Sequence, residues 1–502
     1  MDAGFSNLSR LRRRPPIGLA LTVFALAGVI ASAGLAESLA EPQFVVSGEQ
    51  TITGPFASVQ IAGVPHINQR PDFGGEACIE MFLRKLKVRL DQDGVFEQAG
   101  VDPVLGRGCE ASELARALTK VGFRAGPFEF PLGERDPTGR LNEEFAALHA
   151  DLARGVPSVV CMRSEEDPPA PKYFRLVLGY DSQTDEVLYH DPAVPHGAYL
   201  RMSRSRFLRL WPLATESAPA QVIRLRLEPD HLIRPAIRTE RLTRADYAQH
   251  IRELKPRIPE GFTLVFERPF VVLGNESPET VRERVHNTVD WAVARLKRDF
   301  FDQNPREIID IWLFEDGFSY EEFTHKLFGQ RPTTPYGFYS PRHHALVMNI
   351  ATGGGTLVHE IVHPFIAANF PKCPSWFNEG LASLYEQAHD REGHIAGLTN
   401  WRLRGLHAAI RDGHLPSFEK LCSTTTREFY DRDRGTNYAQ ARYLCYYLQE
   451  HGLLVKFYRA FRRNVATDPT GVETLKAVVG EESLADFQKR WEKYVLKLDF
   501  EP

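Results

Sequence analysis

The sequence predicts an α+β protein with two domains. Short runs of β-branched and aromatic residues occur together with helical periodicity on both sides of a proline-containing break near residue 230. The chain has 502 residues, of which 43% are hydrophobic and 25% are charged, so it can bury more than one core. We expect an N-terminal domain over residues 55–230 and a C-terminal domain over residues 240–500.

The charge balance and hydropathy exclude two classes of protein. Lys and Arg number 61 against 65 Asp and Glu, which gives a formal net charge of −4. We therefore expect no nucleic-acid partner, because such domains carry an excess of basic residues. Residues 17–36 form the only long uninterrupted apolar run, so a protein with several membrane spans is excluded as well.

The first 40 residues are typical of a signal peptide or an N-terminal membrane anchor. Four arginines between residues 10 and 14 precede the apolar run, and Ala31-Ser32-Ala33 offers the small residues that a signal peptidase requires. The run is also long enough to cross a bilayer uncleaved. Both alternatives export the body of the chain, which is then periplasmic, secreted or anchored at the membrane. Six cysteines are too few for a disulfide scaffold, although export permits bridges.

The N-terminal domain shows helical segments followed by strands. Apolar residues recur at helical spacing in Ala77–Lys87 and Ser112–Val121. Three β-rich runs follow, at Ser158–Cys161, Phe174–Tyr180 and Glu186–Tyr189. This order favours an α+β domain.

Short motifs follow one another in this domain, and they are Val64-Pro65-His66-Ile67-Asn68-Gln69, Phe73-Gly74-Gly75-Glu76-Ala77-Cys78, the run from Phe174 to Asp181, and His190-Asp191-Pro192. Their order resembles the papain-like cysteine peptidases that process bacteriocin leaders. By this resemblance Gln69 and Asp191 match the pattern, whereas the nucleophile falls at Gly74 and the general base at Tyr173. Glycine and tyrosine supply neither a thiolate nor an imidazole. We expect an inactive domain that is retained for binding peptides or for packing.

Two alternatives to that interpretation stay open. The first is an active cysteine peptidase in which Cys78 and His190 replace the missing nucleophile and base. Cys78 lies one helical turn beyond the expected nucleophile, where an apolar helix face would bury it as an inert thiol. His190 could likewise take the place of the missing base. An α+β domain unrelated to the papain-like peptidases is the second alternative.

The C-terminal domain begins with strands and ends with helices. Strand-like runs at Thr263–Leu273 and Ile308–Phe314 flank a long amphipathic helix at Glu279–Phe301, and the last hundred residues have helical character. A further strand, Ala345–Ile350, ends at three glycines. We expect this strand to run along the rim of a cleft and to pair with an extended peptide.

A metal motif follows these glycines. His359, Glu360 and His363 form H-E-x-x-H within a helical segment, and residues four apart share one helix face. The two imidazoles can therefore bind one zinc ion, and Glu360 can act as the general base for water. Glu379 lies sixteen residues after His363, at the start of a second predicted helix. Two histidines and one glutamate would leave the fourth zinc position open.

These residues, with Asn378-Glu379-Gly380-Leu381-Ala382, resemble the gluzincin metallopeptidases of the peptidase MA-like group. The resemblance implies that His359, His363 and Glu379 bind zinc and that Glu360 is the general base. The loop between His363 and Glu379 is shorter than in the best-known gluzincins. Tyr438, near the start of a later helix, is our candidate for stabilising the oxyanion.

The sequence therefore predicts an N-terminal papain-like domain and a C-terminal zincin-like domain with a helical tail. The predicted function is that of an exported zinc metallopeptidase that acts on a peptide or protein substrate. Two alternatives are a catalytically inactive peptide-binding protein and a metal-dependent amide hydrolase that acts on cell-wall material. Contact with a membrane would be made through the N-terminal apolar segment. Neither the substrate nor the oligomeric state follows from the sequence.

Overall fold

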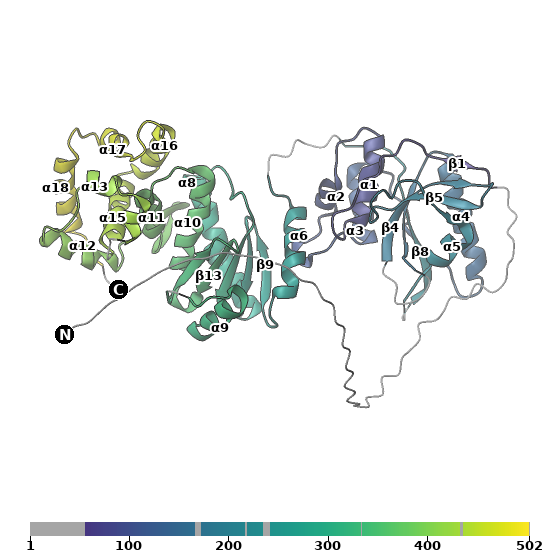
Figure 1. Ribbon diagram of the computed structural model, residues 1–502, viewed down its shortest axis with the longest axis horizontal. Helices are drawn as coiled ribbons and strands as arrows, with labels where there is room; N and C mark the ends of the chain where they lie inside the picture. Colours follow the sequence, from purple (N-terminus) through teal and green to yellow (C-terminus); the bar gives the residue numbers. More distant parts are fainter. Residues whose placement is uncertain are drawn as a thin grey trace, which may run out of the picture. The chain divides into compact units, whose positions relative to one another are not determined.

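The computed structural model describes residues 56–165, 172–215, 218–233, 241–332, 334–431 and 435–500. Helices and sheets occur together in it, so the predicted α+β class is confirmed (Figure 1). The predicted signal peptide or anchor, residues 1–40, lies outside the described residues. Within the described ranges, no helix is long and apolar enough to cross a membrane.

The described part of the N-terminal half contains an antiparallel sheet with the strand order β2-β8-β3-β4-β5-β6, in which β1 also pairs with β4 and β7 with β8. The strands are β1 (Val59–Gln60), β2 (Glu129–Pro131), β3 (Ser158–Arg163), β4 (Lys172–Asp181), β5 (Glu186–His190), β6 (Leu200–Ser203), β7 (Leu213–Thr215) and β8 (Ala218–Arg226). The three strands predicted from the sequence are β3, β4 and β5.

Helices α1 (Gly74–Lys85), α3 (Ala111–Val121), α4 (Pro137–Ala153) and α5 (Arg204–Leu210) contact this sheet, and α2 (Gln92–Ala99) packs against α1 and α3. The two predicted helices correspond to α1 and α3. Helix α3 begins at Glu110, whose side chain takes part in a capping box with Glu113, and it ends at Gly122 in the left-handed conformation. Such end signals explain why its predicted bounds are accurate to one residue.

A second sheet in the C-terminal half has the order β12-β13-β11-β10-β9. Its strands are β9 (Thr263–Glu267), β10 (Phe270–Gly274), β11 (Ile309–Phe314), β12 (Gly337–Ser340) and β13 (Ala345–Asn349). The predicted rim strand Ala345–Ile350 is therefore internal, because β13 pairs with β11 on one side and β12 on the other. It has no free edge for a peptide, so that prediction is wrong, and β12 is the edge strand.

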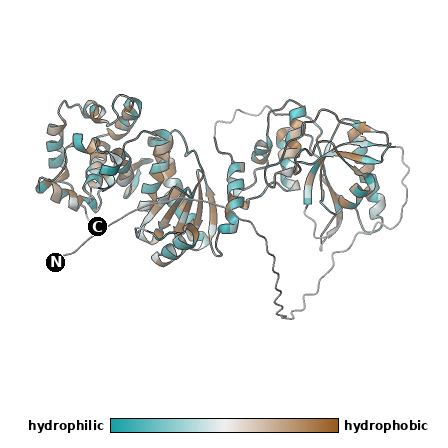
Figure 2. Ribbon diagram, in the orientation of Figure 1, coloured by the Kyte–Doolittle hydropathy of each residue, from teal (hydrophilic) through white to brown (hydrophobic). Residues whose placement is uncertain are grey.

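Both faces of the second sheet are covered. Along β11, Ile311 and Leu313 belong to the apolar cluster that includes the predicted metal-motif helix, whereas Trp312 and Phe314 belong to the cluster on the opposite face. This explains why the part of the strand from Ile311 to Phe314 is entirely apolar. Figure 2 shows that the strands of the second sheet are mostly hydrophobic.

The remaining helical segments differ in part from the prediction. The predicted helix Glu279–Phe301 consists of α7 (Pro278–Arg284), a π-helical turn (Val285–Asp290) and α8 (Trp291–Asp299), and the run Thr263–Leu273 forms two strands. The other helices are α6 (Arg244–Leu254), α9 (Gly317–Phe328), α10 (Gly355–Asn369), α11 (Ser375–Leu384), α12 (Arg402–Arg411), α13 (Phe418–Cys422), α14 (Thr426–Asp431), α15 (Thr436–Glu450), α16 (Leu454–Asn464), α17 (Val472–Val479) and α18 (Leu484–Val495). A hairpin of β14 (Ala388–Arg391) and β15 (His394–Gly397) precedes the helical tail.

Helix α6 contributes to the apolar clusters of both halves. Ala245 and Ala248 pack in the cluster of the first sheet, and Tyr247 and Ile251 pack against the second sheet. The helix lies just after the predicted boundary between the domains. The boundary itself stays a prediction.

Glu76 provides a test of the N-terminal core. It is fully buried in α1, and burial raises its pKa from 4.5 to about 7. Between these pH values the unfolded chain loses a proton that the folded chain retains, so stability falls as pH rises. We expect Glu76→Gln to remove this dependence, which amounts to about 3 kcal/mol. Urea unfolding at pH 5 and pH 7.5 measures it, and parallel losses in wild type and variant would contradict the prediction.

Candidate metal centre

Helix α10 carries the H-E-x-x-H motif and is fixed by its apolar face. Leu357, Ile361 and Phe365 are fully buried in the C-terminal core. The helix begins at Gly355, where an added Cβ would lie 2.0 Å from the backbone oxygen of Glu386. Only glycine permits this close approach, so the start of α10 is packed against the chain that follows α11.

Three side chains of α10 and α11 converge. His359 Nε2 lies 3.3 Å from Glu379 Oε2, and His363 Nε2 lies 3.9 Å from Glu379 Oε1. One ligand atom from each residue can be chosen so that all three lie within 4.8 Å of one another. His359 and Glu379 are 9% and 4% exposed. The structure thus brings together the three residues that the sequence predicts as ligands.

The chemistry of this group fits a zinc ion. Two imidazole nitrogens and one carboxylate oxygen form a ligand set that catalytic zinc uses, with bonds of about 2.0–2.2 Å. Atoms separated by 3.3 to 3.9 Å can share an ion at such distances. Glu379 Oε2 is buried and has no hydrogen-bond partner among the described residues, so a cation would satisfy it.

Outer residues orient both imidazoles. Glu386 Oε1 lies 3.3 Å from His359 Nδ1, and Asn378 Oδ1 lies 3.0 Å from His363 Nδ1. Each Nδ1 thus faces an oxygen, and each Nε2 is left for a metal. Glu386 belongs to no motif in the sequence, and Asn378 stands in a motif without an assigned role.

Glu386 is itself held in place by charge. Arg402 donates to both of its oxygens, at 2.6 and 3.0 Å, and the amide of Asn400 donates at 3.0 Å. A bidentate arginine fixes the plane of a carboxylate. Glu386 is therefore a fixed negative charge at ion-pair distance from His359 Nδ1, which has no hydrogen-bond partner among the described residues.

The pKa values reflect this pocket of carboxylates. Burial opposes protonation of His359, but Glu379 and Glu386 outweigh it and raise the pKa of His359 to about 10. Burial would raise the pKa of Glu379, yet His359 and His363 lower it to about 2. The pocket therefore favours positive charge, which suits a divalent cation.

Tyr430 is the tyrosine whose hydroxyl contacts a candidate ligand. It donates to Glu379 Oε1 at 2.5 Å. Burial, Glu379 and Glu360 raise the pKa of Tyr430, so its hydroxyl stays protonated. Tyr430 is not among the residues predicted from the sequence, since α14 carries no motif.

Tyr438, the tyrosine predicted from the sequence, lies next to Tyr430. Their ring centroids are 6.2 Å apart, and the Arg402 guanidinium lies 5.2 Å from the Tyr438 ring. Tyr443 is buried, and its hydroxyl bonds the backbone of Asn400. Tyr443 thus supports the fold.

A cavity of about 370 Å³ adjoins the candidate centre. His363 and Asn378 line it from the helices, and Tyr339 lines it from the edge strand β12. The cavity therefore lies between a candidate ligand and a strand edge. An extended chain can pair with such an edge.

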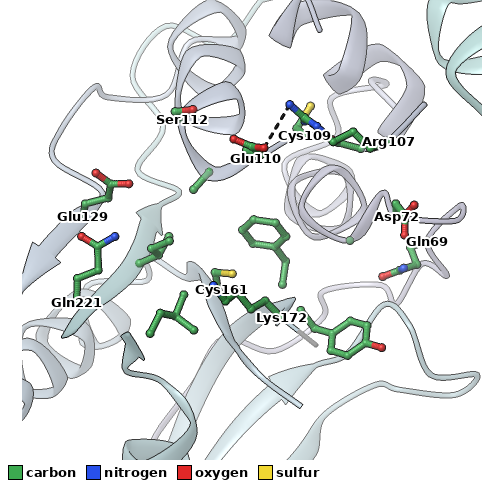
Figure 3. Close-up of a pocket in the computed structure, with 17 residues that line it drawn as sticks. Gln69, Asp72, Arg107, Cys109, Glu110, Ser112, Glu129, Cys161, Lys172 and Gln221 are labelled. Carbon is green, nitrogen blue, oxygen red and sulfur yellow. Dashed lines mark hydrogen bonds and ion pairs between the residues drawn. The ribbon is translucent and has the colours of Figure 1, made fainter. Parts of the chain in front are cut away.

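Three of the four positions that the papain-like resemblance implies line a separate, larger cavity of about 580 Å³ (Figure 3). Gln69, Gly74 and Tyr173 all line it. At Gly74 an added Cβ would lie 2.9 Å from Gln69 Oε1 and 3.7 Å from the Cβ of Phe174. Asp191 is not among the lining residues, and it forms an ion pair of 2.8 Å with Arg175.

Neither shifted residue supplies the missing chemistry. Cys78 is fully buried, and burial raises its thiol pKa well above the ordinary value. His190 is also buried, and burial with the nearby His66 lowers its pKa to about 4. Neither ring nitrogen of His190 has a hydrogen-bond partner among the described residues. All six cysteines are free thiols.

No protein-family model matches the chain, and no curated protein matches it. Among solved structures, it is similar to a crystal structure described as a C39-like peptidase from Bacillus anthracis, with a TM-score of 0.24 and 15% identity. The similarity covers 34% of this chain and 97% of that chain. A TM-score this low assigns neither a fold nor a function.

The Glu386 contact predicts the effect of one substitution. Glu386→Gln keeps the shape of the side chain but removes the charge that faces His359, so we expect zinc affinity to fall about 10- to 100-fold. Competition with a chromogenic chelator measures the affinity. Glu450→Gln, which removes a surface ion pair with Arg391, is the matched control. Equal affinities in Glu386→Gln and wild type would contradict the assigned role.

The buried thiol of Cys78 predicts resistance to alkylation. Iodoacetamide at pH 7 should leave Cys78 unmodified in the folded chain and modify it after unfolding in urea, because only an exposed thiolate reacts. Mass spectrometry of peptides locates the label. Rapid labelling of native Cys78 would instead indicate a reactive nucleophile.

Proposed function

We propose that the chain is a zinc-dependent peptidase with His359, His363 and Glu379 as metal ligands. The observation that carries the proposal is the convergence of these three side chains within 4.8 Å, on two helices that a tight glycine contact holds in place. When bound, zinc would act as a Lewis acid that acidifies water and polarises a carbonyl group.

The proton transfers are assigned to Glu360. It lies on α10 directly after the ligand His359 and is partly exposed, so it borders the ligand group and remains accessible to water. Its carboxylate would take a proton from the attacking water and pass it to the leaving amine. This transfer balances the reaction, since the water supplies both the hydroxyl and the proton.

Tyr430 becomes our first candidate for stabilising the oxyanion. It is 42% exposed, so it faces both Glu379 and the solvent-accessible side of the site. Its single proton is donated to Glu379, so to stabilise a developing negative charge the hydroxyl would turn from Glu379 to that charge. Tyr438 stays the second candidate, since it contacts Tyr430 through its ring.

A peptide is the substrate class that the surroundings favour. The cavity beside His363 reaches the edge strand β12, which pairs with β13 on one side. Its other side can accept an extended main chain. We further propose that the N-terminal half is an inactive papain-like domain and that the chain is exported, as the first 40 residues predict.

Two variants separate metal binding from catalysis. We expect Glu360→Gln to bind zinc like wild type and to lose at least about 100-fold of its peptidase activity, because the base is absent. We expect His359→Ala to lose the metal as well. Zinc content by elemental analysis and cleavage of a peptide library measure the two properties.

The possible outcomes distinguish the candidate functions. Full activity in both variants would contradict the proposal. Zinc binding without peptide cleavage, but with release of amines from cell-wall material, would favour the amide hydrolase. Zinc binding with neither activity would favour the inactive binding protein.

A further pair of variants separates the two tyrosines. We expect Tyr430→Phe to lower kcat at least about 10-fold with KM nearly unchanged, because the hydroxyl would donate to the oxyanion only in the transition state. Tyr438→Phe should have a smaller effect. Steady-state kinetics on one peptide measures both, and the reverse order of effects would restore Tyr438 as the first candidate.

A further inference from the structure

A cavity of about 380 Å³ in the C-terminal half is lined by basic side chains. Lys297 and Arg298 come from the end of α8, and Arg459, Arg462 and Arg463 come from α16. This cavity shares no lining residue with the candidate metal centre.

Aromatic packing joins the two basic segments. The rings of Phe300 and Phe301 contact Tyr458, with centroids 5.4 and 5.8 Å apart. Arg462 forms an ion pair of 3.0 Å with Asp302, in the loop after α8. The basic groups of α8 and α16 are therefore held around one cavity.

Positive charge exceeds negative charge in the cavity. Five cations face two carboxylates, and Asp299 is already bonded to His394 and to the backbone of Ile395. Asp302 is paired with Arg462. The chain as a whole is acidic, at −4, so this concentration of basic groups is local.

Contacts with neighbouring residues fix two of the basic side chains, Lys297 and Arg298. Lys297 donates to Asn304 Oδ1 at 2.8 Å. Arg298 lies against Gly393, where an added Cβ would be 2.1 Å from the guanidinium. Arg459 and Arg463, by contrast, are exposed and stand four residues apart on α16. Like charges at that spacing repel each other, and a bound anion would relieve the repulsion.

We propose that this cavity binds a phosphate group. Four of the five cations are arginines, whose planar guanidinium groups match phosphate oxygens in a bidentate manner. The same chemistry is found in free phosphate compounds and in the headgroups of anionic lipids. None of the proposed zinc ligands lines this cavity.

The test compares two double variants of the full chain. Arg459→Gln/Arg463→Gln removes the two exposed cations of the cavity. Arg404→Gln/Arg411→Gln removes two exposed arginines of α12 and is the matched control for charge. Thermal unfolding and zinc content confirm that each variant keeps the wild-type fold and metal.

Binding is measured with two probes at constant ionic strength. One is inorganic phosphate, measured by calorimetry against chloride, and the other is vesicles with phosphatidylglycerol, measured by flotation against pure phosphatidylcholine. We expect the cavity variant to lose about 10-fold or more in affinity and the control variant to stay near wild type. If the cavity variant loses affinity only for the vesicles, the ligand is a lipid headgroup. If it loses affinity for inorganic phosphate, the ligand is a free phosphate compound. Binding of neither probe, or equal losses in the two variants, would overturn the proposal.

Discussion

The carboxylate of Glu379 is buried between two imidazoles, and the residues around it compensate for the cost of that burial. A buried charge without a partner strongly destabilises a fold. Here His359 and His363 face its two oxygens, and Glu386 faces His359 from the other side. Arg402 then holds Glu386. This network connects the metal-motif helix with the helical tail, and a divalent cation would complete it.

Close helix packing makes the network possible. At Gly355 the start of α10 approaches the backbone of Glu386, and at Gly380 an added Cβ on α11 would lie 2.9 Å from the Ala441 oxygen of α15. A larger side chain at either position would push its helix away from its neighbour. The short loop between His363 and Glu379 can therefore still place the carboxylate beside both imidazoles, because α11 is fixed from both sides.

The sequence predicts those parts of the site that depend on local geometry. His359 and His363 share a helix face by their spacing alone, whereas Glu386 and Tyr430 reach the site only through tertiary contacts that no local pattern encodes. The same difference between local patterns and tertiary contacts decides which parts of the fold are predicted. Helix α3 is predicted well because its caps are local, but β13 was expected at a rim because strand residues do not reveal their pairing partners.

The coordination of zinc in solution tests the central claim most directly. X-ray absorption at the zinc edge, on the full chain loaded with one equivalent of zinc, reports the identity and distance of the ligand atoms. The proposed site predicts two imidazole nitrogens and oxygen ligands at about 2.0–2.2 Å, without sulfur. Sulfur ligands at about 2.3 Å, or failure of the chain to retain one zinc ion, would contradict it.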